Sequence, residues 1–98
     1  MEQKQFADLS DLCNALLSLK TPQECKALLE DLCTIRELQD ISQRLAVAGM
    51  LDRGRNYAEI AAETGASSAT ISRVNRCLQY GSRGYRLVLD RMRKEENQ

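Results

Sequence analysis

The sequence predicts an all-helical protein, and three observations lead to that class. Apolar residues recur at three- and four-residue intervals, as along one face of a helix. The alternation of apolar and polar residues that is typical of a strand is absent. The 98 residues include one proline. Aromatic residues make up 4% of the chain, so aliphatic side chains supply most of the apolar surface. This length suits a single domain covering residues 1–98.

Three helices are expected in the first half of the chain. The first begins after Phe6, and residues 21–24 (Thr-Pro-Gln-Glu) combine an N-cap, a proline at the first helical position and a capping box to open the second. Residues 34–37 (Thr-Ile-Arg-Glu) repeat the capping box and open a third helix, which Gly54 ends after about 19 residues. The apolar positions of these helices are Leu9, Leu12, Cys13, Leu16, Leu19, then Cys25, Leu28, Leu29, Leu32, Cys33, and then Leu38, Ile41, Leu45, Ala48 and Leu51.

The leucines of the first two helices cover more than one helical face. A short chain buries only a modest share of its surface, and excess apolar surface usually meets a partner. We therefore expect residues 9–54 to form the dimerisation helices of a homodimer. The alternative is that these helices pack on the remainder of their own chain.

Residues 56–78 carry the start and stop signals of two short helices around a tight turn. Asn56 and Glu59 have the spacing of a capping box. Gly65 ends the first helix because glycine adopts positive φ without strain, and Ser67 can cap the second.

The inner positions of these two helices are apolar and face one another. Ile60 and Ala61 of the first helix oppose Ile71 and Val74 of the second, and the small Ala61 permits a close, near-perpendicular crossing. This is the helix-turn-helix arrangement, whose second helix enters the major groove of DNA. Thr64 departs from the pattern, since the motif usually has an apolar residue there.

The outer face of the second helix is expected to contact DNA. Small residues at its start let the backbone approach base edges, and arginines further along reach guanine or phosphate. The alternative is a helical hairpin whose polar face is exposed to solvent and binds no partner. The candidate DNA-binding residues are Ser67, Ser68, Ala69, Thr70, Ser72, Arg73 and Arg76.

Charge is unevenly distributed along a chain whose net charge is zero. Residues 1–49 hold five basic and eight acidic side chains, whereas residues 65–94 hold seven basic and one acidic, Asp90. Six of those seven are arginine, which favours phosphate and base contact over simple solvation. A loop over residues 81–84 then leads to a last helix at 85–93, with Leu87, Val88 and Met92 apolar, and to a charged tail, residues 93–98, that is expected to fray.

Several classes of function lack their signatures here. The chain has no histidine, and its four cysteines (Cys13, Cys25, Cys33, Cys77) have no CxxC spacing, so neither a metal site nor a cofactor is expected. Cys13 and Cys33 fall on apolar faces and are expected to be buried. The sequence contains neither a phosphate-binding loop nor a nucleophile motif, so it gives no indication of an enzyme. With no membrane span or signal peptide in the sequence, the expected location is cytoplasmic.

The order of six helices and two short segments resembles the Trp repressor family. Residues 65–73 read Gly-Ala-Ser-Ser-Ala-Thr-Ile-Ser-Arg where the family has Gly-Ala-Gly-Ile-Ala-Thr-Ile-Thr-Arg, and residues 51–54, Leu-Asp-Arg-Gly, are similar to its Leu-Leu-Arg-Gly. The resemblance extends in particular to the Trp-repressor-related proteins of Gram-positive bacteria. It implies a six-helix fold, an intertwined homodimer whose first three helices share a core, and a transcriptional repressor that reads a palindromic operator in double-stranded DNA.

The same resemblance implies a small-molecule site between the third helix and the DNA-reading helix, where the family binds tryptophan. Arg44 and Arg73 match its two arginines, one of which holds the carboxylate and the other flanks the indole. Val74 replaces a glycine and Cys77 a serine. Because overpacking a wall typically costs about 1–3 kcal/mol, we expect tryptophan to bind weakly or not at all and any effector to be a smaller anion. Alternatively there is no effector site, and Arg44 pairs with a carboxylate such as that of Asp40.

A second class of function is a helical protein–protein adaptor whose helix-turn-helix no longer reads DNA. Salt-sensitive binding to mixed duplex DNA separates the two classes, because an adaptor would lack it.

Overall fold

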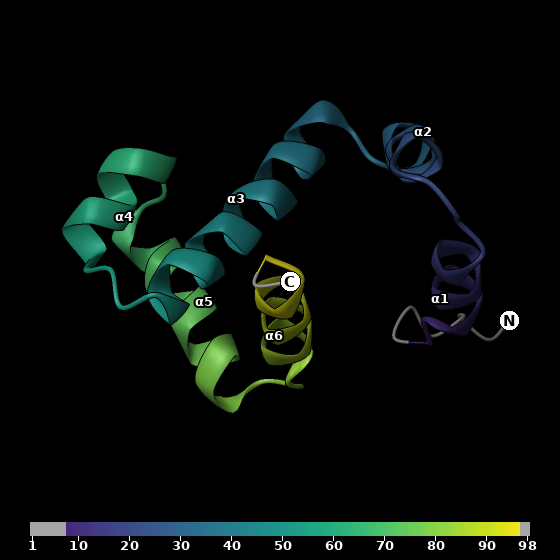
Figure 1. Ribbon diagram of the computed structural model, residues 1–98. Helices are drawn as coiled ribbons and strands as arrows, with labels where there is room; N and C mark the ends of the chain where they lie inside the picture. The colour runs from purple at the N-terminus through teal and green to yellow at the C-terminus, as the bar shows by residue number, and fades with distance from the viewer. Residues whose placement is uncertain (1–7, 97–98) are drawn as a thin grey trace, which may run out of the picture. The chain divides into compact units, whose positions relative to one another are not determined.

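The computed structural model describes residues 8–96, and within that part of the chain it contains six helices and no strand (Figure 1). The all-helical class and the order of the six helices are confirmed. Phe6 and residues 97–98 lie outside the described residues. The helices are α1 (Ser10–Leu17), α2 (Pro22–Leu32), α3 (Ile35–Asp52), α4 (Tyr57–Thr64), α5 (Ser68–Tyr80) and α6 (Gly84–Glu96).

Local hydrogen bonds explain where the first helices begin and end. The prediction for α1 was too long, because the Asp8 carboxylate accepts the Ser10 N–H at its start (3.1 Å) and the Ser18 hydroxyl donates to the Ala15 carbonyl at its end (2.7 Å). At α3 the expected box is reciprocal: the Thr34 N–H donates to the Glu37 carboxylate (2.8 Å), and the Glu37 N–H donates to the Thr34 hydroxyl (3.1 Å). The last helix is also longer than predicted, since residues 93–96 remain helical.

The box at α2 differs in one partner. Thr21 accepts the Glu24 N–H as expected (3.1 Å), but the Glu24 carboxylate accepts the N–H of Lys20, one residue before the cap (2.9 Å). Pro22 occupies the first helical position, where its missing N–H is no loss.

The chain divides into two compact units, Met1–Leu38 and Gln39–Gln98. No described residue of the first unit is buried, and most of its leucines are exposed, with Leu17 at 83% and Leu32 at 54%. The prediction that Cys13 is buried is wrong for this chain, and Cys33 is half-buried at the end of α2. The apolar pattern correctly predicted a helix, but no described residue of the chain buries Cys13.

The second unit has a small aliphatic core that joins α3, α4 and α5. In Figure 1, α5 crosses behind the C-terminal half of α3, with α4 to one side and α6 to the other. Tyr85 and Leu89 of α6 pack against this core, together with Leu51 and Ala61. The predicted inner faces of the helix-turn-helix are thus confirmed. The buried residues are Val47, Ala48, Met50, Ile60, Ala66, Ile71 and Val74.

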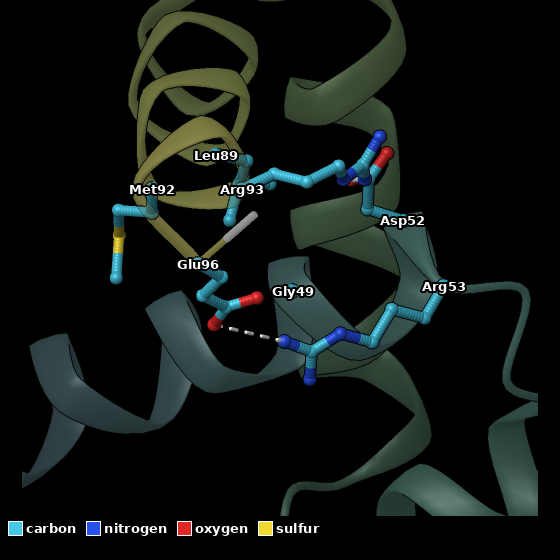
Figure 2. Close-up of a pocket in the computed structure, with 7 residues that line it drawn as sticks. All are labelled: Gly49, Asp52, Arg53, Leu89, Met92, Arg93 and Glu96. Carbon is cyan, nitrogen blue, oxygen red and sulfur yellow. Dashed lines mark hydrogen bonds and ion pairs between the residues drawn. The ribbon is translucent and has the colours of Figure 1, made fainter. Parts of the chain in front are cut away.

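Ion pairs attach α6 to the end of α3 (Figure 2). Arg86 donates to one carboxylate oxygen of Asp52 at 2.7 Å, and Arg93 pairs with the other. Arg53 and Glu96 lie 3.9 Å apart at the rim of a pocket of about 70 Å³ beside them. The Asp52 carboxylate holds the pKa of Arg86 above its ordinary value.

Candidate nucleic-acid interface

The turn between α4 and α5 is built as the sequence predicts. The Asn56 side chain accepts the Glu59 N–H (2.9 Å), and the Glu59 carboxylate accepts the Asn56 N–H (3.2 Å). The Asn56 N–H is also the main reason that the pKa of Glu59 lies below its ordinary value. Gly65 has a φ of 74° and donates its N–H to the Ala61 carbonyl (2.9 Å), so it ends α4 in the left-handed conformation.

Thr64 fits the turn although the motif usually has an apolar residue there. Its hydroxyl donates to the Ile60 carbonyl (2.7 Å) and accepts the Ala66 N–H (3.1 Å). The Gln43 side chain of α3 donates to the Thr64 carbonyl (3.0 Å). The polar groups of Thr64 are therefore satisfied, and the turn is tied to α3.

The first turn of α5 is held by the N-cap residue Ser67 and by Thr70 within the helix. Ser67 accepts the Thr70 N–H and donates its own proton to the Thr70 hydroxyl, each at 3.1 Å. Ser68, Ala69 and Ser72 are exposed and lie along the outer face. Ser67 and Thr70 thus fix the start of a helix whose small, exposed residues are open to a partner.

The arginines of α5 differ from the other arginines near them. Arg73 and Arg76 are exposed, and neither makes an ion pair or hydrogen bond with another described residue. By contrast, Arg55 pairs with the carboxylates of Glu59 and Glu63, which raise its pKa. The arginines of α5 are therefore available to bind an external anion.

The sequence count of seven basic residues to one acidic overstated the positive charge around α5. Arg86 and Arg93 are both paired with Asp52, which lies outside the window that was counted. The basic residues of that window without an ion pair to any described residue are Arg73, Arg76, Arg83, Arg91 and Lys94. On α5 itself the charged side chains without an ion pair to a described residue are Arg73 and Arg76.

The residues predicted for a small-molecule site are in different environments. Val74 is 2% exposed and belongs to the core. Arg44 is half-buried, and its Nε donates to the Asp40 backbone carbonyl at 3.4 Å. Cys77 lines an open apolar groove of about 580 Å³ between α3, α5 and α6, whose lining includes neither Arg44 nor Arg73. The four residues predicted for the effector site therefore do not line this groove together.

Residues 8–96 contain neither a cluster of metal-ligating side chains nor a membrane-spanning helix. No group of three or more acidic, cysteine or histidine side chains is placed to hold a metal ion. No helix in this part of the chain is long and apolar enough to cross a membrane.

A capped turn, a buried inner face and an exposed second helix with unpaired arginines define a helical protein of the helix-turn-helix class. The chain belongs to the Trp repressor family, whose Trp repressor protein profile matches residues 7–93. This is a family of helical DNA-binding regulators and not of enzymes.

Relatives of known sequence or structure agree with this assignment. The uncharacterized protein YerC of Bacillus subtilis is 52% identical over 91 residues, which cover 93% of this chain and 88% of that protein. The crystal structure of a candidate Trp repressor from Staphylococcus aureus has a TM-score of 0.84 and 49% identity, covering 91% of this chain and 89% of its own. The crystal structure of a TrpR-like protein from Eubacterium eligens has a TM-score of 0.83 and 51% identity, covering 86% of this chain and 87% of its own.

Proposed function

We propose that this protein is a sequence-specific transcriptional repressor that reads a palindromic operator through α5. The observation that carries the proposal is the exposed face of α5, where small residues at a capped start are followed by Arg73 and Arg76, which have no carboxylate partner among residues 8–96. A face of this kind is suited to DNA, because phosphates supply the anions and base edges supply the hydrogen-bond partners that it lacks.

Each part of α5 has its own role in this proposal. Ser68, Ala69 and Ser72 approach base edges, since the N-terminal residues of a reading helix lie deepest in the major groove. Arg73 and Arg76 bind phosphate or guanine. Ser67 and Thr70 flank the first turn, and their mutual hydrogen bonds hold it in place.

Operator reading further requires two copies of α5. The exposed leucines of α1 and α2 are the surface that we assign to a homodimer, because large exposed apolar patches mark association sites. In a symmetric dimer of this class the two reading helices contact half-sites about 34 Å apart, one turn of DNA.

The decisive experiment replaces both unpaired arginines of α5. The Arg73→Ala/Arg76→Ala variant should lose most of its affinity for mixed duplex DNA. The slope of log affinity against log salt should fall by about 0.9 for each phosphate contact removed. The matched control is Arg91→Ala/Lys94→Ala, which removes the same charge from α6 and should bind more nearly as the wild type does.

Two results would contradict the proposal. One is unchanged DNA affinity in the double arginine variant at low and moderate salt. The other is a wild-type protein that shows no salt-dependent binding to duplex DNA, which is the behaviour expected of an adaptor.

A further inference from the structure

A short chain of polar side chains connects the start of α4 to the middle of α5. The Asn75 amide donates to the Tyr57 hydroxyl at 3.4 Å, and the Gln79 amide donates to the Asn75 side-chain oxygen at 3.2 Å. Tyr57 is 39% exposed, and Asn75 is half-buried at the edge of the core face. These three residues lie outside the DNA-binding set predicted from the sequence.

The direction of these hydrogen bonds determines what Tyr57 can offer to a partner. Its oxygen accepts from Asn75, so its own proton remains for another acceptor. No described residue takes that proton. Asn75 is in turn held at its oxygen by Gln79, which fixes the amide that faces Tyr57. The result is an uncharged, oriented donor at the protein surface.

The donor lies at the edge of the proposed reading face. Asn75 is three residues after Ser72 and directly before Arg76, so it borders the stripe that these side chains form along α5. Tyr57 is the first residue of α4, the first helix of the motif, which in this class crosses the DNA backbone and does not enter the groove. The acceptor nearest to such a position is a phosphate oxygen and not a base edge.

We propose that the Tyr57 hydroxyl donates a hydrogen bond to a phosphodiester oxygen of the operator, with Asn75 and Gln79 as the positioning residues. Neutral side chains such as tyrosine commonly make phosphate contacts of this kind, which fix the register of the protein on the duplex. The inference rests on the proposed DNA binding and adds a backbone contact from α4 to it.

The test compares Tyr57→Phe with Tyr80→Phe. Each removes one hydroxyl and keeps the ring, but Tyr80 is 82% exposed and makes no hydrogen bond to a described residue. Tyr57→Phe should weaken binding about two- to tenfold, the range of one neutral hydrogen bond, to operator and mixed duplex alike. Its salt slope should equal that of the wild type, because no charge is lost. Tyr80→Phe should bind as the wild type does.

A double-mutant cycle tests the positioning role of Asn75. If Asn75 orients the hydroxyl, Tyr57→Phe should cost less in an Asn75→Ala background than in the wild type. Equal costs in both backgrounds would overturn this part of the proposal.

The outcomes separate this inference from the proposed function. Wild-type affinity in Tyr57→Phe, together with loss of binding in the double arginine variant, would overturn the Tyr57 contact and leave DNA reading intact. A loss confined to one operator sequence would also overturn it, because it would indicate a base contact. If the wild type itself does not bind DNA, both proposals fail together.

Discussion

Val74 is important both for the packing of the helix-turn-helix and for the predicted effector site. Its substitution gives a quantitative prediction. The side chain is 2% exposed within the aliphatic core of the second unit. Val74→Ala removes two buried carbon atoms at about 0.8 kcal/mol each, and the residual cavity adds to this while the better helix propensity of alanine subtracts a little. The free energy of unfolding should therefore fall by about 2 kcal/mol. Val74→Gly removes a third carbon and adds about 1 kcal/mol for glycine within a helix, so its loss should be about 3–4 kcal/mol.

Thermal unfolding at fixed protein concentration measures these losses. For a domain of this size, about 2 kcal/mol corresponds to a fall of roughly 8–16 °C in Tm. Val88→Ala is the matched control, because it is the same substitution at a side chain that is 42% exposed. A Val74→Ala loss no larger than the control loss would refute the packing role of Val74.

Calorimetric titration with tryptophan, carried out where each variant is folded, tests the second consequence. The wild type should bind tryptophan weakly or not at all, because Val74 occupies the apolar half of the site that the family resemblance implies. The glycine variant should bind more tightly, by roughly ten- to a hundredfold if the steric cost is about 1–3 kcal/mol. Micromolar binding by the wild type, with tryptophan raising DNA affinity, would show that the chain accommodates Val74 and that the steric reasoning fails.

Two further predictions concern assembly and pH. Sedimentation equilibrium at micromolar concentration should show a homodimer, because most leucines of α1 and α2 are exposed in the part of the chain that the structure describes. Detection of only an 11.1 kDa species would exclude the homodimer. The pKa of Glu59 is lowered from its ordinary value of 4.5, so its carboxylate contributes stability above that pH and loses it as the pH falls through the lowered pKa. The difference in unfolding free energy between the wild type and Glu59→Gln should therefore shrink on acidification, and a difference independent of pH would contradict this.

Local signals in the sequence predicted the helix-turn-helix almost completely. The cap at Asn56, the stop at Gly65 and the cap at Ser67 each depend on residues within four positions, and the structure contains all three. The inner face was predictable for a similar reason, because helical periodicity determines which side chains share a side. The Thr64 hydrogen bonds were missed, although a side-chain hydroxyl near a helix end is a known signal for backbone bonding.

Contacts between residues distant in sequence could not be predicted from local sequence signals. Asp52 pairs with Arg86 and Arg93, which are 34 and 41 positions away, and no local pattern relates them. The Tyr57–Asn75 contact spans 18 positions and depends on how α4 crosses α5. Burial of Cys13 could not be predicted from periodicity. An apolar helix face indicates that burial of that face is favourable, but it does not indicate whether the same chain or a partner buries it.

The distribution of buried residues separates the two parts of the proposed mechanism. Every buried residue among residues 8–96 lies between Val47 and Val74, so the core that orients α5 consists of residues of the second unit. The residues of that core and those packed against it include no leucine of α1 or α2. A change at Leu32 should therefore act on association and alter how operator occupancy depends on protein concentration. A change at Ile71 should instead act on the reading helix itself, and raising the protein concentration would not restore a helix face that is no longer held in place.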